Sequence, residues 1–413
     1  MTKTKKLTNI LFYGDYDCTT GFGNVSKEII SRLSKEKSYK FVVFATNNFA
    51  DKEYAVSDNV MVIPAYLNGE NKKDVLYRKE FLSLLFSNPF DILICLNDLE
   101  VFSQMEKNLK ELKLEKAKKN LPNFKSILYF PIDSEPKSSN FSVLSFFNEI
   151  FTYTDYAKGF ISLYDEKLSK KVKVVNHGVD TNAFYPLNEA KKKEIKERMF
   201  GRSDVFVFGS VNRNSARKDI SSLLLGFAQF KNTSPVDAIL YLHCNPLDHF
   251  GVNLIELCNR LMLEIDKDVY FPNGFSENKG FSVERLNEVY NAFDCFITTT
   301  TAEGWGLSVT EAMATKTLVV MPKHTSLVEI GDNGNNCLSF LFGQSCVFAN
   351  DGTNIRTLTN PNEVSSLMGI VYNLNEKEKI DIDAIIDRAY NHVKKYKWEN
   401  VAHEFKLKIE KLK

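Results

Sequence analysis

Short apolar runs rich in β-branched and aromatic residues alternate along the chain with segments of helical periodicity. The first unit consists of a predicted strand at residues 9–13, a polar loop, apolar residues at helical spacing from Val25 to Leu33, and a second strand at 41–44. A strand, a helix and a strand in this order form a βαβ unit, which implies a parallel sheet. Most of the runs are continuously apolar, as expected of strands buried on both faces. The pattern therefore predicts an α/β protein with doubly wound parallel sheets.

This pattern forms two series, separated by a turn-rich stretch at 176–186 and a charged helix at 189–199. Further strands of the first series are predicted at 60–63, 91–96, 126–130, 149–152 and 172–175. Strands of the second series are predicted at 205–211, 238–243, 268–271, 295–298, 317–321 and 345–348. Helices of the second series are predicted at 221–230, 251–263, 283–293 and 307–314.

The length of 413 residues suits two domains of this kind. We predict an N-terminal domain over residues 1–180 and a second domain over 181–390. The final stretch, 383–413, is predicted to be helical and carries Trp398. Its last part, 391–413, is expected to cross back to the N-terminal domain.

The charge balance argues against one class of partner. The chain has 53 Lys and Arg against 52 Asp and Glu, which gives a net charge of +1. A dedicated nucleic-acid-binding domain is normally strongly basic, so no nucleic-acid partner is expected. Hydrophobic residues make up 44% and charged residues 25%, which is typical of a globular protein with a large core.

The cysteines favour a reducing compartment. They number seven and form no C-x-x-C pair. We find no features of a signal peptide and no apolar run near the roughly 18 residues of a membrane span. We therefore expect a cytoplasmic protein without a transmembrane segment. Peripheral contact with a membrane surface and the oligomeric state stay open.

The most informative segment is bounded by Glu303 and Glu311, with seven residues between them. Because the Gly-Trp-Gly at 304–306 disfavours helix, Glu303 is predicted on the loop after a strand and Glu311 about one turn inside the next helix. The backbone N–H groups at 306–308 then point out of the helix start, which makes an anion site. Two carboxylates beside it can accept hydrogen bonds from sugar or ribose hydroxyls. The alternative is an ordinary turn with two solvated acids.

A second segment, 209–219, is rich in cations and asparagines. It contains Asn212, Arg213, Arg217 and Lys218, after the strand predicted at 205–211. Ligands bind at the carboxyl ends of strands in open α/β sheets. Arginine and lysine there can clamp a diphosphate and stabilise the charge on a leaving group. The alternative is a loop that carries ordinary surface cations.

The first strand-to-helix junction contains half of a dinucleotide-binding fingerprint, Gly21-Phe22-Gly23 followed by Ser26. The third glycine is absent, and the next strand ends in Ala45-Thr46 instead of an acid, which argues against an NAD-dependent oxidoreductase. A glycine-rich loop that reaches a ligand across a cleft fits as well. The sequence has no H-E-x-x-H motif and no close His/Cys cluster, so no metal site is predicted.

Taken together, these segments resemble a GT-B glycosyltransferase, and more narrowly the retaining family-4 group that uses nucleotide-activated sugars. The resemblance depends on Glu303 and Glu311, the basic loop 212–218, the linker 176–186 and the terminal stretch 397–401. It implies two Rossmann-like doubly wound parallel-sheet domains that face a central cleft, with domain 1–180 on the acceptor side and domain 181–390 on the side of the nucleotide-sugar donor. The chain, rich in Lys, Asn and Phe, also resembles a member carried by a large DNA virus.

The resemblance implies roles for individual residues. Glu311 would hold the ribose hydroxyls of the donor, Glu303 would contact the transferred sugar, and Asp133 stands where many relatives carry a histidine near the reacting carbon. The residues expected to be catalytic are Arg213, Lys218, Glu303 and Asp133. The residues expected to bind the donor are Gly23, Asn212, Arg213, Lys218, Asn273, Gly274, Glu303, Trp305, Gly306, Leu307, Ser308 and Glu311.

The implied reaction is retaining transfer of a hexose from a nucleotide-diphosphate sugar to an unknown glycan, lipid or protein acceptor. A GDP-mannose type of donor is slightly favoured over a UDP-sugar. Two cations and a helix N-terminus would stabilise the leaving group, so neither a metal nor a cofactor is expected. Gly23 would close over the phosphates, and the stretch 271–275 would meet the base. The alternatives are an epimerase or sugar phosphorylase on the same fold, a non-catalytic nucleotide-sugar binder, and an NAD-dependent oxidoreductase.

Overall fold

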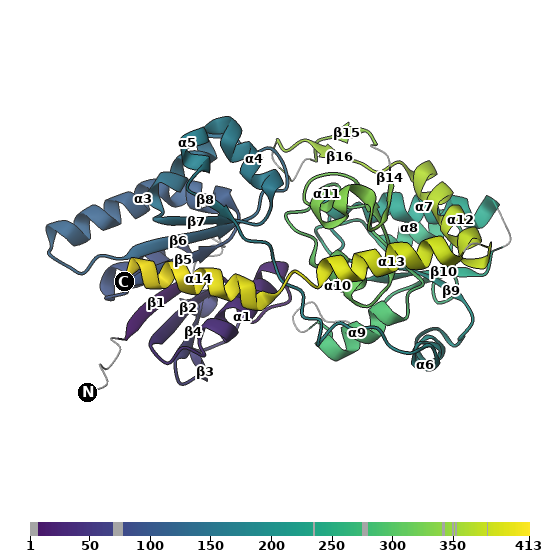
Figure 1. The fold of residues 1–413 in the computed structure, drawn as a ribbon, viewed down its shortest axis with the longest axis horizontal. Helices are drawn as coiled ribbons and strands as arrows, with labels where there is room; N and C mark the ends of the chain where they lie inside the picture. Colours follow the sequence, from purple (N-terminus) through teal and green to yellow (C-terminus); the bar gives the residue numbers. More distant parts are fainter. Residues whose placement is uncertain are drawn as a thin grey trace. The chain divides into compact units, whose positions relative to one another are not determined.

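The chain folds into two compact α/β units (Figure 1). The computed structural model describes residues 7–68, 77–233, 236–274, 280–340, 343–348, 351, 353–377 and 379–413. Unit 1 comprises the described residues up to Ile132 together with Pro136–Gly178 and Trp398–Lys413. Unit 2 comprises Asp133–Glu135 and Val179–Lys397.

Unit 1 is built on an eight-stranded sheet with the order β3-β4-β2-β1-β5-β6-β7-β8. Its strands are β1 (Thr8–Asp15), β2 (Tyr39–Thr46), β3 (Tyr54–Ser57), β4 (Val60–Pro64), β5 (Ile92–Leu96), β6 (Lys125–Phe130), β7 (Glu149–Thr152) and β8 (Val172–Val174). Neighbouring strands are parallel except β3 and β4. The seven apolar runs predicted in this half all form strands. The sequence did not predict β3, because most of its four residues are exposed.

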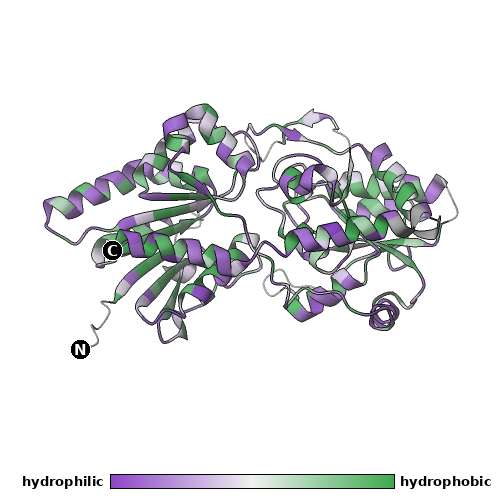
Figure 2. Ribbon diagram, in the orientation of Figure 1, coloured by the Kyte–Doolittle hydropathy of each residue, from purple (hydrophilic) through white to green (hydrophobic). Residues whose placement is uncertain are grey.

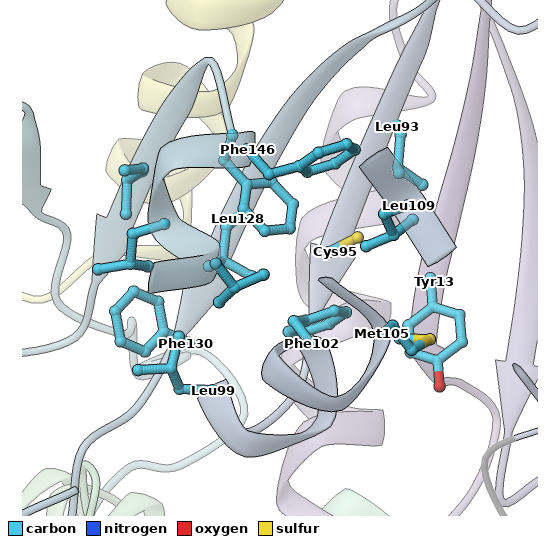
Figure 3. Close-up of a cluster of buried hydrophobic side chains, with 14 of the residues drawn as sticks. Tyr13, Leu93, Cys95, Leu99, Phe102, Met105, Leu109, Leu128, Phe130 and Phe146 are labelled. Atoms are coloured by element: carbon cyan, nitrogen blue, oxygen red, sulfur yellow. The ribbon is translucent and has the colours of Figure 1, made fainter. Parts of the chain in front are cut away.

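Helices surround this sheet and bury one face against it. They are α1 (Gly21–Leu33), α2 (Arg78–Ser87), α3 (Leu99–Lys118), α4 (Asp155–Tyr164), α5 (Glu166–Ser169), α14 (Trp398–Leu412) and the 3-10 segments η1 (Ala65–Asn68) and η2 (Ser138–Phe146). Helix α3 shows the pattern: Phe102, Met105 and Leu109 recur at helical spacing and are fully buried. They pack with Tyr13 and Cys95 of the sheet (Figure 3). Burial of each such side chain stabilises the folded state by roughly 1.5–3 kcal/mol.

Unit 2 is built on a six-stranded parallel sheet with the order β11-β10-β9-β12-β13-β14. Its strands are β9 (Phe206–Val211), β10 (Ala238–His243), β11 (Val269–Tyr270), β12 (Cys295–Ile297), β13 (Leu318–Pro322) and β14 (Leu338–Phe340). The helices are α6 (Glu189–Phe200), α7 (Ile220–Thr233), α8 (Leu254–Arg260), α9 (Val283–Asn291), α10 (Leu307–Ala314), α11 (Leu327–Ile330), α12 (Pro361–Lys377) and α13 (Lys379–Val393), with the 3-10 segments η3 (Ala216–Lys218) and η4 (Asp332–Gly334). Helix α6 is hydrophilic along most of its length (Figure 2).

The prediction of a sheet strand at 345–348 was wrong. Ser345–Cys346 forms the short strand β15, which pairs antiparallel with β16 (Arg356–Thr357) in a separate ribbon. The sixth strand of the sheet is β14 instead. Ser345 and Val347 are exposed, so this run lacks the burial that a strand of the sheet requires.

The stretch 383–413 is helical, as predicted, but the chain breaks within it, between α13 and α14. The Tyr396 carbonyl accepts a hydrogen bond from the Val179 N–H at 3.0 Å, which removes it from a helical ladder. Trp398 then starts α14 and packs against Gly178, where a Cβ would lie 2.3 Å from the Trp398 nitrogen. The break carries the chain from unit 2 to unit 1.

The strand order of unit 2 places its ligand-binding edge. From β9 the chain proceeds through β10 to β11 on one side, and then returns to β12 on the other side of β9. In open α/β sheets, ligands bind beside such a reversal, at the carboxyl ends of the strands. The loops at this edge of the sheet are 212–219 after β9 and 298–306 after β12.

Candidate functional site

A run of threonines joins the loops after β9 and β12. The Thr299 hydroxyl donates to the Asp219 carbonyl at 2.7 Å. The Thr301 N–H and hydroxyl both donate to the Arg217 carbonyl, at 2.8 and 2.9 Å. These bonds hold the basic loop against the loop that carries Glu303.

Glu303 is buried and is surrounded by cations of the basic loop. Lys218 Nζ forms an ion pair with Glu303 Oε1, and Arg217 Nη1 lies 3.4 Å from Oε2. Burial alone would raise the pKa of Glu303, but the charges of Lys218 and Arg217 outweigh it and lower the pKa to about 2. Glu303 is therefore ionised at neutral pH.

Glu311 has a different environment, one turn inside α10 as predicted. The Tyr290 hydroxyl of α9 donates to Glu311 Oε2 at 2.6 Å, and Tyr290 is fully buried. Burial raises the pKa of Glu311 to about 7, although the hydrogen bond from Tyr290 acts in the opposite direction. Sequence reasoning missed Tyr290, because nothing in the sequence of α9 points to α10.

The start of α10 lies between the two glutamates. Gly306 precedes the helix with φ of +114°, a conformation that favours glycine. The N–H groups at the start of a helix lack helical partners and attract anions, and here they belong to Leu307 and Ser308. The preceding turn is held by Ser326, whose hydroxyl donates to the carbonyls of Glu303 at 2.8 Å and Trp305 at 2.7 Å. Trp305 is buried and meets the Tyr396 ring edge-on, so it contributes packing to the turn.

Two arginines that the sequence prediction did not assign to the site belong to the same cluster. Arg217 Nε lies 3.7 Å from Asp133 Oδ2, and Arg356 Nη1 lies 3.0 Å from Asp133 Oδ1. Arg217 could be found from its place beside Lys218. Arg356 comes from the β15–β16 ribbon, which carries no recognisable motif. The structure thus brings Lys218, Glu303 and Asp133 together through arginines.

Arg213 is not part of this cluster. Its Nε donates to Asp248 Oδ2 at 2.6 Å, and its guanidinium lies over the Phe250 ring at 4.4 Å. Asn212 is buried, and its amide donates to the hydroxyls of Ser210 and Thr298 at 3.0 and 3.3 Å. The sequence treated Arg213 and Lys218 as equivalent cations, whereas the structure gives them different carboxylate partners.

The remaining predicted residues, Asn273, Gly274 and Gly23, belong to other elements of the two units. Asn273 and Gly274 occupy an exposed turn after β11, and Phe275 lies outside the described residues. Gly23 belongs to unit 1, in the first turn of α1. A Cβ there would lie 2.7 Å from Cys18 Sγ, so local packing already accounts for this glycine.

The described residues contain neither a candidate membrane span nor a candidate metal cluster. Within the described ranges, no helix combines the length and the apolar character needed to cross a membrane. The described side chains also include no group of three or more His, Cys, Asp or Glu that could hold a metal ion. Independence from metals and cofactors stays a prediction.

The two parallel-sheet α/β units define the fold as GT-B. Residues 254–350, which include both glutamates, match the family described as Glycosyl transferases group 1. Mannosylfructose-phosphate synthase of Agrobacterium fabrum is 27% identical over 173 residues, which cover 41% of this chain and 36% of that protein. The similarity to this relative therefore spans a minor part of its length.

Solved structures match the chain over almost its whole length. HepE of Anabaena in complex with UDP and glucose has a TM-score of 0.67 and 15% identity, covering 98% of this chain and 100% of HepE. HepE has also been solved with UDP-glucose. Sucrose-phosphate synthase of Thermosynechococcus elongatus has a TM-score of 0.71 and 13% identity, covering 98% and 99% of the two chains. At these identities the similarity establishes the fold.

Proposed function

We propose that this protein is a glycosyltransferase that moves a sugar from a nucleoside diphosphate to an acceptor hydroxyl. The observation that carries the proposal is the start of α10, where a glycine-containing turn separates Glu303 from Glu311 and Lys218 pairs with the first of them. This turn lies within the stretch that matches Glycosyl transferases group 1.

The geometry supports a division of roles around the donor. The diphosphate would lie at the start of α10, against the N–H groups of Leu307 and Ser308. Lys218, with Arg217 beside it, would stabilise the charge of the leaving diphosphate. Glu303 and Glu311 would accept hydrogen bonds from hydroxyls of the sugar and of the ribose. Because Glu303 is ionised at neutral pH, it acts as an acceptor and not as a proton donor.

We propose transfer with retention of configuration. The bond between the anomeric carbon and the phosphate oxygen breaks, and its electron pair goes to the phosphate. The acceptor oxygen bonds to the same face of that carbon, and its proton goes to the leaving phosphate oxygen. Pairing of Glu303 with Lys218 and Arg217 supports this route, because it makes that carboxylate a weak nucleophile. The proposed reaction needs no metal.

We propose a UDP-sugar as the donor. HepE, which has the same fold, binds UDP and UDP-glucose in its structures. The slight preference for GDP-mannose in the sequence prediction gains no support from these relatives. The acceptor stays open, and a cytoplasmic location and a viral origin stay predictions from the sequence.

A panel of nucleotides tests the proposal directly. The melting temperature should rise with UDP or UDP-glucose, and less with GDP- or ADP-sugars. Stabilisation by NAD, with none by a sugar nucleotide, would point to the oxidoreductase instead. Release of UDP from UDP-glucose should persist in EDTA; its loss would contradict the metal-free route. Formation of a UDP-linked epimer or a sugar phosphate, without transfer to an acceptor, would favour the epimerase or phosphorylase.

Replacement of Lys218 tests its role at the leaving group. Lys218→Ala should lower kcat for UDP-glucose hydrolysis by roughly 10²- to 10³-fold, because a cation at the developing charge is lost. The matched control is Lys267→Ala, since Lys267 is exposed and pairs with Glu264 on the surface. Circular dichroism would verify that both variants are folded. Unchanged turnover in Lys218→Ala would refute the leaving-group role.

A further inference from the structure

Charged side chains of unit 2 form a line in which negative and positive groups alternate, here called the charge ladder. In spatial order its members are Asp351, Arg356, Asp133, Arg217, Glu303 and Lys218. The last two belong to the candidate site, and the first two belong to the β15–β16 ribbon and its loop. The ladder therefore connects a peripheral ribbon to the carboxylate proposed to contact the sugar.

Arg356 is the most enclosed member of the outer part of the ladder, with 3% of its side chain exposed. Its Nε and Nη2 donate to the two carboxylate oxygens of Asp351 at 2.6 and 3.1 Å, which is a bidentate pair. Its Nη1 lies 3.0 Å from Asp133 Oδ1 and 3.4 Å from the Asp133 carbonyl. A planar guanidinium held at all three nitrogens fixes the position of its partners.

Asp133 is held between two arginines. Oδ1 faces Arg356, and Oδ2 faces Arg217 at 3.7 Å. Each carboxylate oxygen thus has its own cation. In this arrangement both oxygens of the Asp133 carboxylate face arginines, so the carboxylate can orient those arginines.

Arg217 connects Asp133 to the candidate site. Its Nη1 donates to the Ala302 carbonyl and lies 3.4 Å from Glu303 Oε2. The charges of Glu303 and Asp133 raise the pKa of Arg217 against the opposing effect of burial. Removal of one member of such a partly buried chain takes a counter-charge from its neighbours, so the members depend on one another.

We propose that Arg356 and Asp133 are positioning residues, which hold Arg217 in the orientation that serves the leaving diphosphate and Glu303. This inference rests on the proposed glycosyltransferase function. It gives Asp133 a role different from that of a catalytic group at the reacting carbon, and it makes the ribbon a functional part of unit 2.

The test is a double-mutant cycle on UDP-glucose hydrolysis. Arg356→Gln should lower kcat by roughly 10- to 100-fold, the range expected when a reacting group is misplaced. The Kd for UDP should stay within about twofold, because Arg356 is proposed to act through Asp133 and Arg217 and not on the nucleotide. Arg217→Gln combined with Arg356→Gln should be no worse than Arg217→Gln alone, since Arg356 acts through Arg217.

Matched variants make the cycle specific. Arg213→Gln removes an arginine that pairs with Asp248, so its loss of kcat should multiply with that of Arg356→Gln. The exposed Arg260→Gln should have the kcat of the wild type. Arg356→Gln with Asp351→Asn removes the outer pair without leaving a lone charge. It serves as the second variant if Arg356→Gln alone does not fold.

The outcomes separate this inference from the proposed function. If the losses from Arg217→Gln and Arg356→Gln multiply, the positioning role is overturned while the glycosyltransferase reading stands. Loss of UDP affinity with unchanged kcat in Arg356→Gln also overturns it. If wild-type protein neither binds UDP nor releases it from UDP-glucose, the proposed function fails, and this inference fails with it.

Discussion

Glu303 and Glu311 flank the same helix start, yet their carboxyl groups differ in charge state. Burial acts on both and would raise both pKa values. Lys218 and Arg217 lower the pKa of Glu303 to about 2, whereas Glu311 receives a hydrogen bond from the neutral Tyr290 and has a pKa of about 7. The cations beside Glu303 therefore account for the difference between the two pKa values, since burial acts on both groups in the same direction.

This difference matches the two roles proposed for them. A carboxylate that is always charged suits contact with a sugar whose bond is breaking. A carboxyl that titrates near neutral pH makes binding of the ribose depend on pH. Experiments on each glutamate can test this difference in pKa and in role.

The largest expected contrast is in stability. Glu303→Gln deprives Lys218 and Arg217 of a shared counter-charge, so the free energy of unfolding should fall by about 3 kcal/mol. Glu311→Gln alters one hydrogen bond to Tyr290, so the free energy of unfolding should change by about 1 kcal/mol. Urea unfolding at pH 6 measures both. Equal losses in the two variants would mean that the cations do not distinguish the glutamates.

The sequence predicted the framework of the site because that framework is local. Continuous apolar runs identified the central strands, and the glycines at 304–306 placed Glu303 on a loop and Glu311 inside a helix. Both conclusions depend on residues a few positions apart. The sequence did not predict the short antiparallel strand β3 or the break before Trp398, because these depend on exposed residues or on distant backbone partners.

The partners that set the chemistry were not predictable in the same way. Tyr290 reaches Glu311 from α9, and Arg356 reaches Asp133 from the β15–β16 ribbon, so their positions depend on tertiary packing. The sequence also gave Arg213 the same role as Lys218, although Arg213 pairs with Asp248. The opposite pKa shifts of the two glutamates follow from Lys218 and Arg217 beside Glu303 and from the burial of Glu311, which depend on the folded structure, so the sequence alone did not indicate them.

The second contrast is in pH dependence. Because the folded pKa of Glu311 is about 7, above its ordinary value, the stability that its neutral form contributes is lost as pH rises from about 4.5 through 7. Relative to Glu311→Gln, the wild type should lose up to about 3 kcal/mol over this range. For Glu303 the sign is reversed: its contribution is present above about pH 4.5 and is lost as pH falls toward 2.

Unfolding of the wild type and Glu311→Gln in urea, compared at pH 5, 6, 7 and 8, isolates this effect. The difference between the two proteins removes the titration of all other groups. A difference that does not change with pH would show that Glu311 keeps an ordinary pKa. In that case the distinction between the two glutamates would lie in their partners alone and not in their charge.

The smallest expected effect comes from Tyr290→Phe, which removes the hydroxyl and keeps the ring that packs against Phe184. Its hydrogen bond lowers the pKa of Glu311, so the variant should shift the pH midpoint of the preceding experiment upward. UDP affinity at pH 7 should fall about three- to tenfold, which corresponds to about 1 kcal/mol.

Two comparisons make the effect of Tyr290→Phe specific to Glu311. The control Tyr185→Phe removes the hydroxyl of a tyrosine that is 45% exposed, and should leave UDP affinity unchanged. Affinity for 2′-deoxy-UDP should fall less in Tyr290→Phe than affinity for UDP, since Glu311 is proposed to act through the ribose hydroxyls. Equal losses for the two nucleotides would assign Tyr290 to the general packing of α9. The hydrogen bond at Glu311 would then be incidental, and burial alone would account for its pKa.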